Sequence, residues 1–133
     1  MRVLVDTCIW SVVFRYKNPV KNISDELRRL VVDDRAMIIG PIRQEILSSI
    51  KEPGKYEGLK NIFRSFIDLP MKTEIFELAA DMSNQCRRKG ISGSSVDFMI
   101  CASARYYSLE IWSTDPDFIN YDKILGLDLY KMA

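Results

Sequence analysis

The chain has 133 residues, which fits one domain with a sizeable hydrophobic core and is too short for two domains of ordinary size. Hydrophobic residues make up 47% of it and charged residues 28%, so the disordered and fibrous classes are excluded and a soluble globular protein is indicated. The chain has no histidine, which excludes Ser-His and Cys-His nucleophilic pairs and imidazole-ligated zinc centres. A net charge of +1 gives no overall basic field that would indicate nucleic acid, although a local basic patch is still possible.

The cysteines and the apolar runs indicate the cellular compartment of the protein. Cys8, Cys86 and Cys101 are odd in number and lack C-x-x-C spacing, so we expect reduced, mostly buried thiols and neither a disulfide framework nor a zinc site. The longest nearly apolar run, 8–14, is far shorter than the roughly 20 residues of a membrane span, and Asp6 stands where the apolar region of a secretory signal should begin. We therefore expect residues 1–133 to form a single cytoplasmic domain without membrane contact.

The first half of the chain alternates between strand-like and helix-like patterns. Short β-branched or apolar runs predict buried strands, and apolar residues three or four positions apart predict helices. Asn22 or Ser24 is the expected cap of the second predicted helix, and Pro41 takes the first position of the third. In chain order, the patterns predict a strand over 2–5, a helix over 8–14, a helix over 22–32, a strand over 36–39 and a helix over 41–50.

The same alternation continues in the second half. Pro53-Gly54 predicts a break in the chain, Thr73 is the expected cap of a long helix, and the basic segment 87–89 followed by Gly90 is typical of that helix's end. In chain order, the patterns predict a helix over 56–65, a strand over 66–69, a helix over 73–89, a helix from 93–95 to about 107, a strand over 110–113, a short helix from Asp115-Pro116 and a strand over 127–130.

Strands that alternate with helices predict an α/β fold. We expect a three-layer α/β/α sandwich with a central, mostly parallel sheet of four to five strands covered by helices on both faces. In such sheets, ligands bind beyond the carboxyl ends of the strands. That edge is therefore where a functional site is expected.

Four acidic residues are predicted to meet at this edge. Asp6 directly follows the first strand, and Asp115 follows the strand that contains Trp112. Glu45 lies in the second turn of the helix after the second strand, and Asp97 lies near the start of the helix that leads into the 110–113 strand. The amino-terminal end of that helix should face the same edge, so the four carboxylates should converge.

Each acid also has an ordinary structural role open to it, and taken singly that role is the better explanation. Asp6 and Asp115 can cap the helices that follow them. Ser94-x-x-Asp97 matches a capping box, and an isolated glutamate such as Glu45 is usually a solvated helix residue.

The helix around Asp97 favours a functional role, because residues 96–104 are apolar nearly all round and predict a buried helix. A carboxylate in that setting, with no basic residue one turn away, must be paired or metal-bound. Four clustered carboxylates repel one another unless a divalent cation with a preference for oxygen ligands lies between them. The cluster therefore predicts Mg²⁺ or Mn²⁺.

A divalent metal at this edge would suit phosphodiester hydrolysis without histidine. It lowers the pKa of bound water, and a pair of ions ~3.5–4 Å apart can hold both the attacking and the leaving oxygen. Thr7 and Ser113 can orient a metal ligand or a water, and a plain strand-end hydroxyl is at least as good an interpretation of either.

Four segments carry the acids and form a set of motifs. These segments resemble, in the same order, the motifs of the PIN-domain family, and within that family those of the VapC-type toxins of toxin-antitoxin pairs. The resemblance extends over essentially the whole chain. Ser113 replaces a usual threonine, and Cys8 stands where an asparagine or serine is common. The segments are Val-Leu-Val-Asp6-Thr7-Cys-Ile, Ile42-Arg-Gln-Glu45-Ile-Leu, Gly90-Ile-Ser-Gly-Ser-Ser-Val-Asp97-Phe-Met-Ile-Cys-Ala102 and Ser113-Thr-Asp115-Pro-Asp117-Phe118.

The resemblance implies a metal-dependent endoribonuclease that forms a homodimer and is held inactive by a cognate antitoxin whose tail covers the site. It implies that Asp6, Glu45, Asp97 and Asp115 are the catalytic metal ligands. Asp117 is a further candidate ligand, and first-turn charge at a helix start explains it equally well.

The alternative function is a catalytically inactive PIN-like RNA-binding or scaffold module. A receiver domain is disfavoured because Asp68, before Leu69-Pro70, makes a poor phosphoacceptor, and an aspartyl phosphatase would need Asp-x-Asp-x-Thr after the first strand.

Basic and aromatic residues offer candidate RNA contacts, each with an ordinary alternative. Trp10 and Trp112 can stack on bases, although packing in the core is the better interpretation. For the basic side chains, solvated surface charge is the better interpretation of each one taken singly. The candidate phosphate contacts are Arg43, Lys72, Arg87, Arg88 and Lys89.

Overall fold

A parallel sheet of three short strands lies at the centre of the structure, a computed structural model that describes residues 1–14 and 20–132. The strands are β1 (Val3–Val5), β2 (Ala36–Met37) and β3 (Glu110–Trp112), and their order in the sheet is β2-β1-β3. β1 is therefore paired on both sides and is fully buried, as its β-branched sequence predicts.

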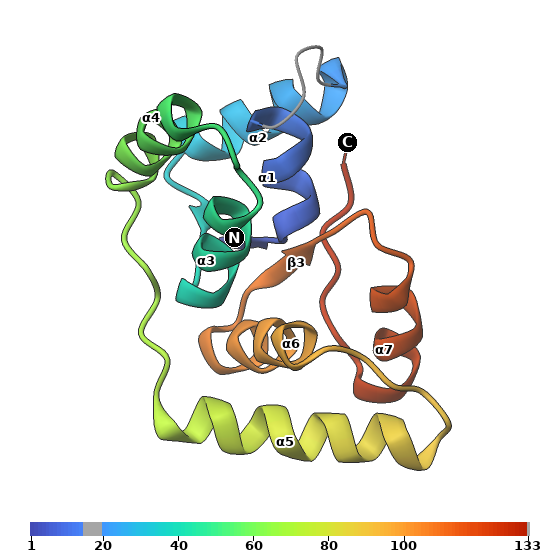
Figure 1. Cartoon of the computed structure of the whole chain (residues 1–133). Helices are drawn as coiled ribbons and strands as arrows, with labels where there is room; N and C mark the ends of the chain where they lie inside the picture. Colours follow the sequence, from blue (N-terminus) through green and yellow to red (C-terminus); the bar gives the residue numbers. More distant parts are fainter. Residues whose placement is uncertain (15–19, 133) are drawn as a thin grey trace.

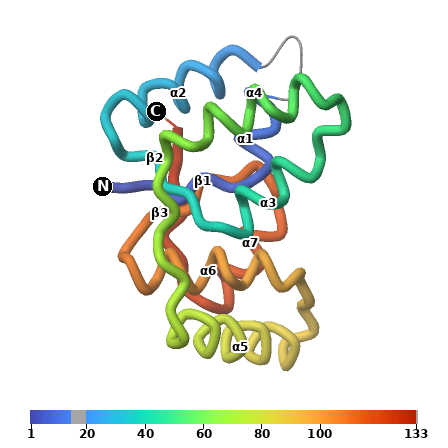
Figure 2. The backbone as a smooth tube through the Cα atoms, turned by 60° about the vertical axis from the view of Figure 1, so that its left-hand side comes forward, coloured from blue at the N-terminus to red at the C-terminus, as the bar shows by residue number. Residues whose placement is uncertain are grey.

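Helices cover this sheet on both sides. Figures 1 and 2 show α1 to α4 on one side of the strands and α5 to α7 on the other. The alternating α/β order predicted from the sequence is confirmed. The helices of the described residues are α1 (Thr7–Phe14), α2 (Lys21–Val32), α3 (Gly40–Ser48), α4 (Pro53–Phe63), α5 (Thr73–Arg88), α6 (Ser95–Tyr107) and α7 (Asp117–Leu125).

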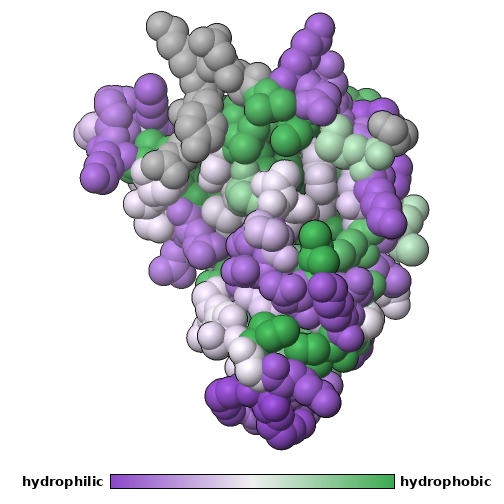
Figure 3. Space-filling view, turned by 90° about the vertical axis from the view of Figure 1, so that its right-hand side faces the viewer, coloured by the Kyte–Doolittle hydropathy of each residue, from purple (hydrophilic) through white to green (hydrophobic). Residues whose placement is uncertain are grey.

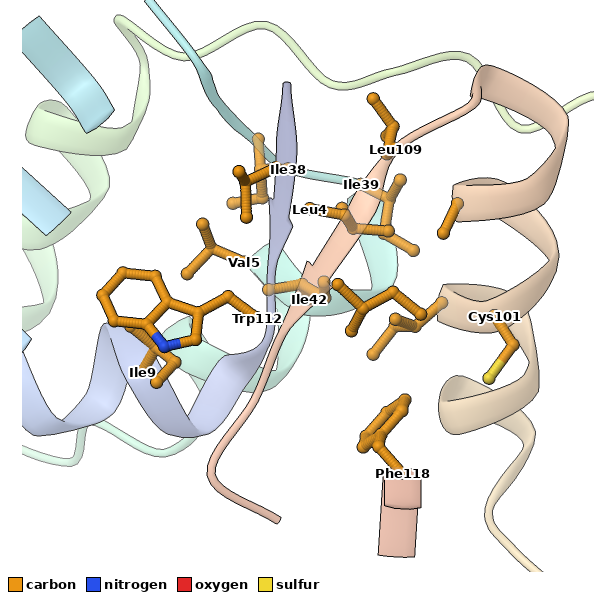
Figure 4. Packing of buried hydrophobic residues seen from close by; sticks show 14 of the residues in the cluster. Leu4, Val5, Ile9, Ile38, Ile39, Ile42, Cys101, Leu109, Trp112 and Phe118 are labelled. Atoms are coloured by element: carbon orange, nitrogen blue, oxygen red, sulfur yellow. The ribbon is translucent and has the colours of Figure 1, made fainter. Parts of the chain in front are cut away.

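The core lies between the sheet and its helices. Figure 4 shows side chains from β1, β3, α1, α3, α6 and α7 packed around the strands, among them Leu4, Ile42 and Phe118. Trp10 and Trp112 are both buried in this core, and the Trp10 indole donates a hydrogen bond to the carbonyl of Val5 at 3.0 Å. The preferred interpretation, packing in the core, is therefore confirmed for both residues.

The sheet is smaller than the predicted four to five strands. In place of the predicted strands 66–69 and 127–130, the described residues form two single parallel bridges, Ile38 to Asp68 and Ile111 to Leu129. Pro70 lacks the amide hydrogen that a ladder needs, and so pairing cannot extend past Leu69. These segments lie at the two edges of the sheet without becoming strands.

Several predicted helix starts and caps differ from the structure, and Pro41 is the second residue of α3, where the first position was predicted. α4 begins at Pro53, where a break was predicted, because the Glu52 carboxylate accepts hydrogen bonds from the amides of Gly54 at 2.9 Å and Lys55 at 2.7 Å. α2 begins at Lys21, so the predicted caps Asn22 and Ser24 lie inside it. Thr73 is the first residue of α5, with Lys72 as its cap.

The cysteines are free, as predicted, with Cys86 and Cys101 buried and Cys8 partly buried. Among the described residues, no helix is both long enough and apolar enough to cross a membrane.

Arg43 connects α3 to the end of α4, so it is neither free as a candidate phosphate contact nor a solvated surface charge. Its guanidinium donates to the carbonyls of Phe63 and Phe66, both at 2.7 Å, and to the Asp68 carboxylate at 2.9 Å. One arginine thus satisfies the carbonyl at the end of α4, a second carbonyl and one acid in the segment that follows this helix.

Replacing Arg43 with methionine should lower the free energy of unfolding by about 2 kcal/mol, because the two carbonyls lose their donors while the apolar stem is kept. Thermal or urea unfolding measures the change. The exposed Arg64, at the end of α4, provides the control, since Arg64→Met removes an arginine without these bonds. Equal stability of the two variants would show that the Arg43 bonds add nothing.

Candidate metal centre

The site lies where β1 and β3 end. β3 points to the right-hand side of Figure 1, and Figure 3 views that side, where hydrophilic residues run across the middle with hydrophobic patches above and below. In the parallel register Val5 lies opposite Trp112, and the amide of Asp6 donates to the Trp112 carbonyl at 2.9 Å. This pairing places Asp6 beside Ser113, the residue that follows β3.

Asp6 is the buried acid of the site, with 7% of its surface exposed. Its Oδ1 accepts a hydrogen bond from the Thr7 amide at 2.7 Å, and its Oδ2 accepts from the Ser113 hydroxyl at 2.7 Å and the Cys8 thiol at 3.4 Å. Burial raises the pKa of Asp6, the three hydrogen bonds oppose that rise, and the negative charge of Asp97 adds to it. The surroundings of Asp6 thus stabilise its charged form only in part.

Thr7 connects Asp6 to Glu45. While its amide donates to Asp6, its hydroxyl donates to Oε1 of Glu45 at 2.7 Å. Glu45 is exposed on α3, so the hydroxyl of Thr7 fixes a carboxylate that otherwise faces solvent.

Asp97, Asp115 and Asp117 form the closest group of acids in the described part of the chain, since one oxygen of each lies within 4.8 Å of the others. Asp117 belongs to this group, although its sequence position explained it equally well as helix-start charge. Of the four acids predicted to converge, Asp97 and Asp115 therefore meet directly. Asp6 adjoins them through Ser113, whose hydroxyl also accepts from the Asp115 amide at 3.0 Å, and Glu45 is connected only through Thr7.

The capping roles predicted for these residues coexist with the cluster. Ser94 caps α6 by accepting a hydrogen bond from the Asp97 amide at 3.1 Å, which is one half of the predicted capping box; the Asp97 carboxylate accepts from Tyr121 instead of the Ser94 amide. The Asp115 carboxylate accepts from the Asp117 amide at 2.9 Å at the start of α7. The caps hold the backbone of each acid in place, and carboxylate oxygens remain for other partners.

The chemistry of the donors fits a metal ion. Three carboxylates at this separation repel one another, and the ion pairs of the described residues, Arg29 with Glu26 and Arg43 with Asp68, lie outside the group. An all-oxygen donor set is the kind that hard divalent cations prefer. The acidic triad can therefore bind a metal ion, which would reverse the sign of these interactions.

The prediction that Asp97 is buried is wrong in one respect. In α6, Phe98 and residues 100–104 are buried, as predicted, but Asp97 lies in the first turn, at the edge of the sheet, and is only half-buried. Its carboxylate is partnered by the hydroxyl of Tyr121, which donates to Oδ2 at 2.7 Å.

Tyr121 and Thr114 are two site residues that the sequence analysis did not identify. Tyr121 is fully buried in α7, and both burial and its bond to Asp97 raise the pKa of its hydroxyl, so it acts as a neutral donor. Thr114 donates its hydroxyl to the Cys8 thiol at 3.3 Å, and that thiol lies 3.4 Å from the Ser113 hydroxyl. Tyr121 lies 24 residues from Asp97, and no local pattern could reveal that contact.

A model of the PIN domain matches residues 3–124 of this chain. The chain belongs to the PIN-domain family. Among solved structures, this PIN domain is similar to FitAcB from Neisseria gonorrhoeae, with a TM-score of 0.78, 18% identity, and coverage of 97% of this chain and 96% of that chain. It is also similar to DNA-bound VapBC from Salmonella typhimurium, with a TM-score of 0.77, 18% identity and coverage of 98% and 97%.

A third similar structure is a toxin-antitoxin complex from Klebsiella pneumoniae, with a TM-score of 0.70, 15% identity, and coverage of 98% of this chain and 99% of that chain. At these identities the likeness shows the fold, an α/β PIN-like fold with a three-stranded parallel sheet. No protein of curated function matches the chain.

The raised pKa of Asp6 predicts a pH-dependent stability. The folded protein keeps the Asp6 proton at pH values at which the unfolded chain has released it, so metal-free stability falls as the pH rises from the ordinary pKa of an aspartate toward neutral. Asp6→Asn lacks this titration. The melting temperature of the wild type relative to Asp6→Asn should therefore drop between about pH 4 and about pH 7 in the presence of a chelator.

Asp81→Asn, in the exposed part of α5, is the control. Its melting temperature should follow that of the wild type at both pH values. If the melting temperature of Asp6→Asn also follows that of the wild type at both pH values, burial does not destabilise the charged form of Asp6.

Proposed function

We propose that this PIN-domain protein is a metal-dependent endoribonuclease that hydrolyses RNA phosphodiester bonds, and that it is the toxin of a VapBC-type toxin-antitoxin pair. The observation that carries the proposal is the approach of Asp97, Asp115 and Asp117 to within 4.8 Å without a basic partner among the described residues. Membership of the PIN-domain family supports it.

The acids would have different roles in this proposal, according to their positions in the site. Asp97, Asp115 and Asp117 would hold Mg²⁺ or Mn²⁺, and Asp6, one hydroxyl away through Ser113, would complete the negative site. When bound, the metal lowers the pKa of a water and stabilises charge on phosphodiester oxygens. Glu45 is exposed and accepts a hydrogen bond from Thr7, and in this proposal it would contact water that enters the site with the RNA.

Phosphate contacts of the RNA would come from exposed basic residues. With Arg43 used inside the fold, the remaining candidates lie at the two ends of α5, where Lys72 precedes the helix and Arg87, Arg88 and Lys89 end it. Such contacts position the backbone of the RNA and carry no sequence preference of their own.

The partners follow from the same proposal. The solved neighbours include a toxin-antitoxin complex and DNA-bound VapBC, and we propose for this chain a cognate antitoxin whose tail covers the acids, and a homodimer of single domains over 1–133. One continuous hydrophobic cluster, which runs from Val3 to Leu125, supports the single domain. As a toxin acting on RNA, it would work in the cytoplasm.

The alternative is a PIN-like RNA-binding or scaffold module that keeps the acids without turnover. The mutual repulsion of the clustered carboxylates argues against it, because acids that no longer hold a cation only destabilise the fold.

The purified protein should cleave single-stranded RNA with Mg²⁺ or Mn²⁺ and lose the activity in a chelator. Asp97→Asn and Asp6→Asn should each lower the rate by about 100-fold or more, because each removes negative charge from the metal centre. Asp81→Asn provides the matched control and should cleave as the wild type does. Cleavage that survives chelation, or that both site variants retain, would exclude the mechanism.

Expression of the chain alone in bacteria should arrest growth, and Asp97→Asn should not, because the arrest requires RNA cleavage. Colony counts after induction, with immunoblots to equalise protein levels, measure the effect. Co-expression of a small neighbouring reading frame that encodes the antitoxin should relieve the arrest. Arrest by Asp97→Asn equal to that of the wild type would contradict the toxin role as proposed.

A further inference from the structure

A buried tyrosine hydroxyl at the back of the site contacts one of the clustered acids. Tyr121 has no exposed surface, and its ring packs against the rings of Phe98, with centroids 5.1 Å apart, and Phe118, with centroids 5.3 Å apart. The only hydrogen bond of its hydroxyl among the described residues goes to Oδ2 of Asp97 at 2.7 Å. A side chain packed in this way has one orientation, so the direction of its hydroxyl is fixed as well.

The same contact selects the conformation of the Asp97 carboxylate. Its Oδ2 is taken by Tyr121, while within the described chain its Oδ1 accepts no hydrogen bond. A neutral donor on one oxygen fixes the rotation of the carboxylate without cancelling its charge. The charge therefore remains available at the second oxygen.

Tyr121 also places α7 relative to α6. Asp117 and Tyr121 are four residues apart in α7, so they lie on one face of that helix. The bond from Tyr121 to Asp97 therefore holds the face of α7 that carries Asp117 against the first turn of α6. The oxygens of Asp97 and Asp117 meet as a result.

Gly93 makes room for this hydroxyl. A Cβ atom on residue 93 would overlap the hydroxyl oxygen of Tyr121 and would lie 2.8 Å from its Cζ and 3.1 Å from Cε2 of Phe98. Real Cβ atoms essentially never come within 3.0 Å of another heavy atom, and the fully buried ring of Tyr121 would have to shift to relieve the overlap. Only glycine lets the chain before α6 pass over the tyrosine.

We propose that Tyr121 is a positioning residue that orients the Asp97 carboxylate for cation binding, and that Gly93 is required because it leaves the tyrosine hydroxyl its place. This inference rests on the metal centre of the proposed function and goes beyond it, since neither residue is an acid of that centre. The tyrosine acts through Asp97 and does not touch the cation or the RNA.

Mn²⁺ binding by the purified protein tests the proposal without any RNA. Tyr121→Phe keeps the ring and removes the hydroxyl, so Mn²⁺ affinity, measured by titration calorimetry or from the electron paramagnetic resonance of free Mn²⁺, should fall about tenfold, the usual effect of losing a partner of a metal ligand. Tyr107→Phe is the matched control. It removes a tyrosine hydroxyl that donates to the Pro70 carbonyl at 2.5 Å, at the opposite end of α6, and should bind Mn²⁺ as the wild type does.

Gly93→Ala tests the same contact from the other side. It should lower Mn²⁺ affinity by a similar factor, because the added methyl displaces the hydroxyl. The double variant with Tyr121→Phe should lose less Mn²⁺ affinity than the two single losses combined, since both changes act on one hydroxyl, although the close contacts of the added methyl with Cζ of residue 121 and Cε2 of Phe98 remain. Circular dichroism identifies the variants that fold, and if Tyr121→Phe does not fold, Gly93→Ala decides the question.

Wild-type Mn²⁺ affinity in a folded Tyr121→Phe or Gly93→Ala variant would overturn the positioning role. So would equal losses in Tyr121→Phe and Tyr107→Phe, because these would show a general effect of removing hydroxyls. Asp97→Asn separates this failure from failure of the proposed function. If Asp97→Asn also binds Mn²⁺ as the wild type does, the metal centre itself is wrongly placed, whereas loss of binding in Asp97→Asn alone rejects only Tyr121 and Gly93.

Discussion

The parallel pairing of β1 with β3 is the constraint on which the rest of the site depends. Because both strands run in the same direction and Val5 lies opposite Trp112, the residues that follow them, Asp6 and Ser113, leave the sheet side by side. The chain then turns into α1 after one strand and toward α7 after the other. The three residue pairs of β1 and β3 therefore bring Asp6 and Ser113, and the segments that lead into α1 and α7, to one edge of the sheet.

The acids at this edge are held by neutral donors. Hydroxyls of Thr7, Ser113 and Tyr121 and the thiol of Cys8 contact the carboxylates, whereas the ion-paired arginines, Arg29 and Arg43, lie elsewhere in the fold. Neutral donors fix the direction of a carboxylate and leave its charge in place. The site therefore keeps a strong local negative potential in a chain whose net charge is only +1.

Local sequence patterns predicted most of this arrangement, because strand ends and helix starts are encoded locally. Asp115 and Asp97 lie near one another as their positions after β3 and at the start of α6 required, and Ser94 caps α6 as its spacing to Asp97 indicated. The patterns failed where the outcome depended on distant contacts. The extent of the sheet edges and the partner of Asp97 depend on tertiary packing, and the buried position expected for Asp97 belongs to Asp6.

Asp115 has two structural roles, so its substitution has wider effects than the substitution of Glu45. Its carboxylate belongs to the acidic group and also accepts the Asp117 amide at the start of α7, so its loss disturbs a helix as well as the site. The Glu45 carboxylate is exposed and accepts one hydrogen bond from the described residues, that of Thr7. Substitution of Glu45 therefore removes an acid from the site while leaving the helices and the sheet intact.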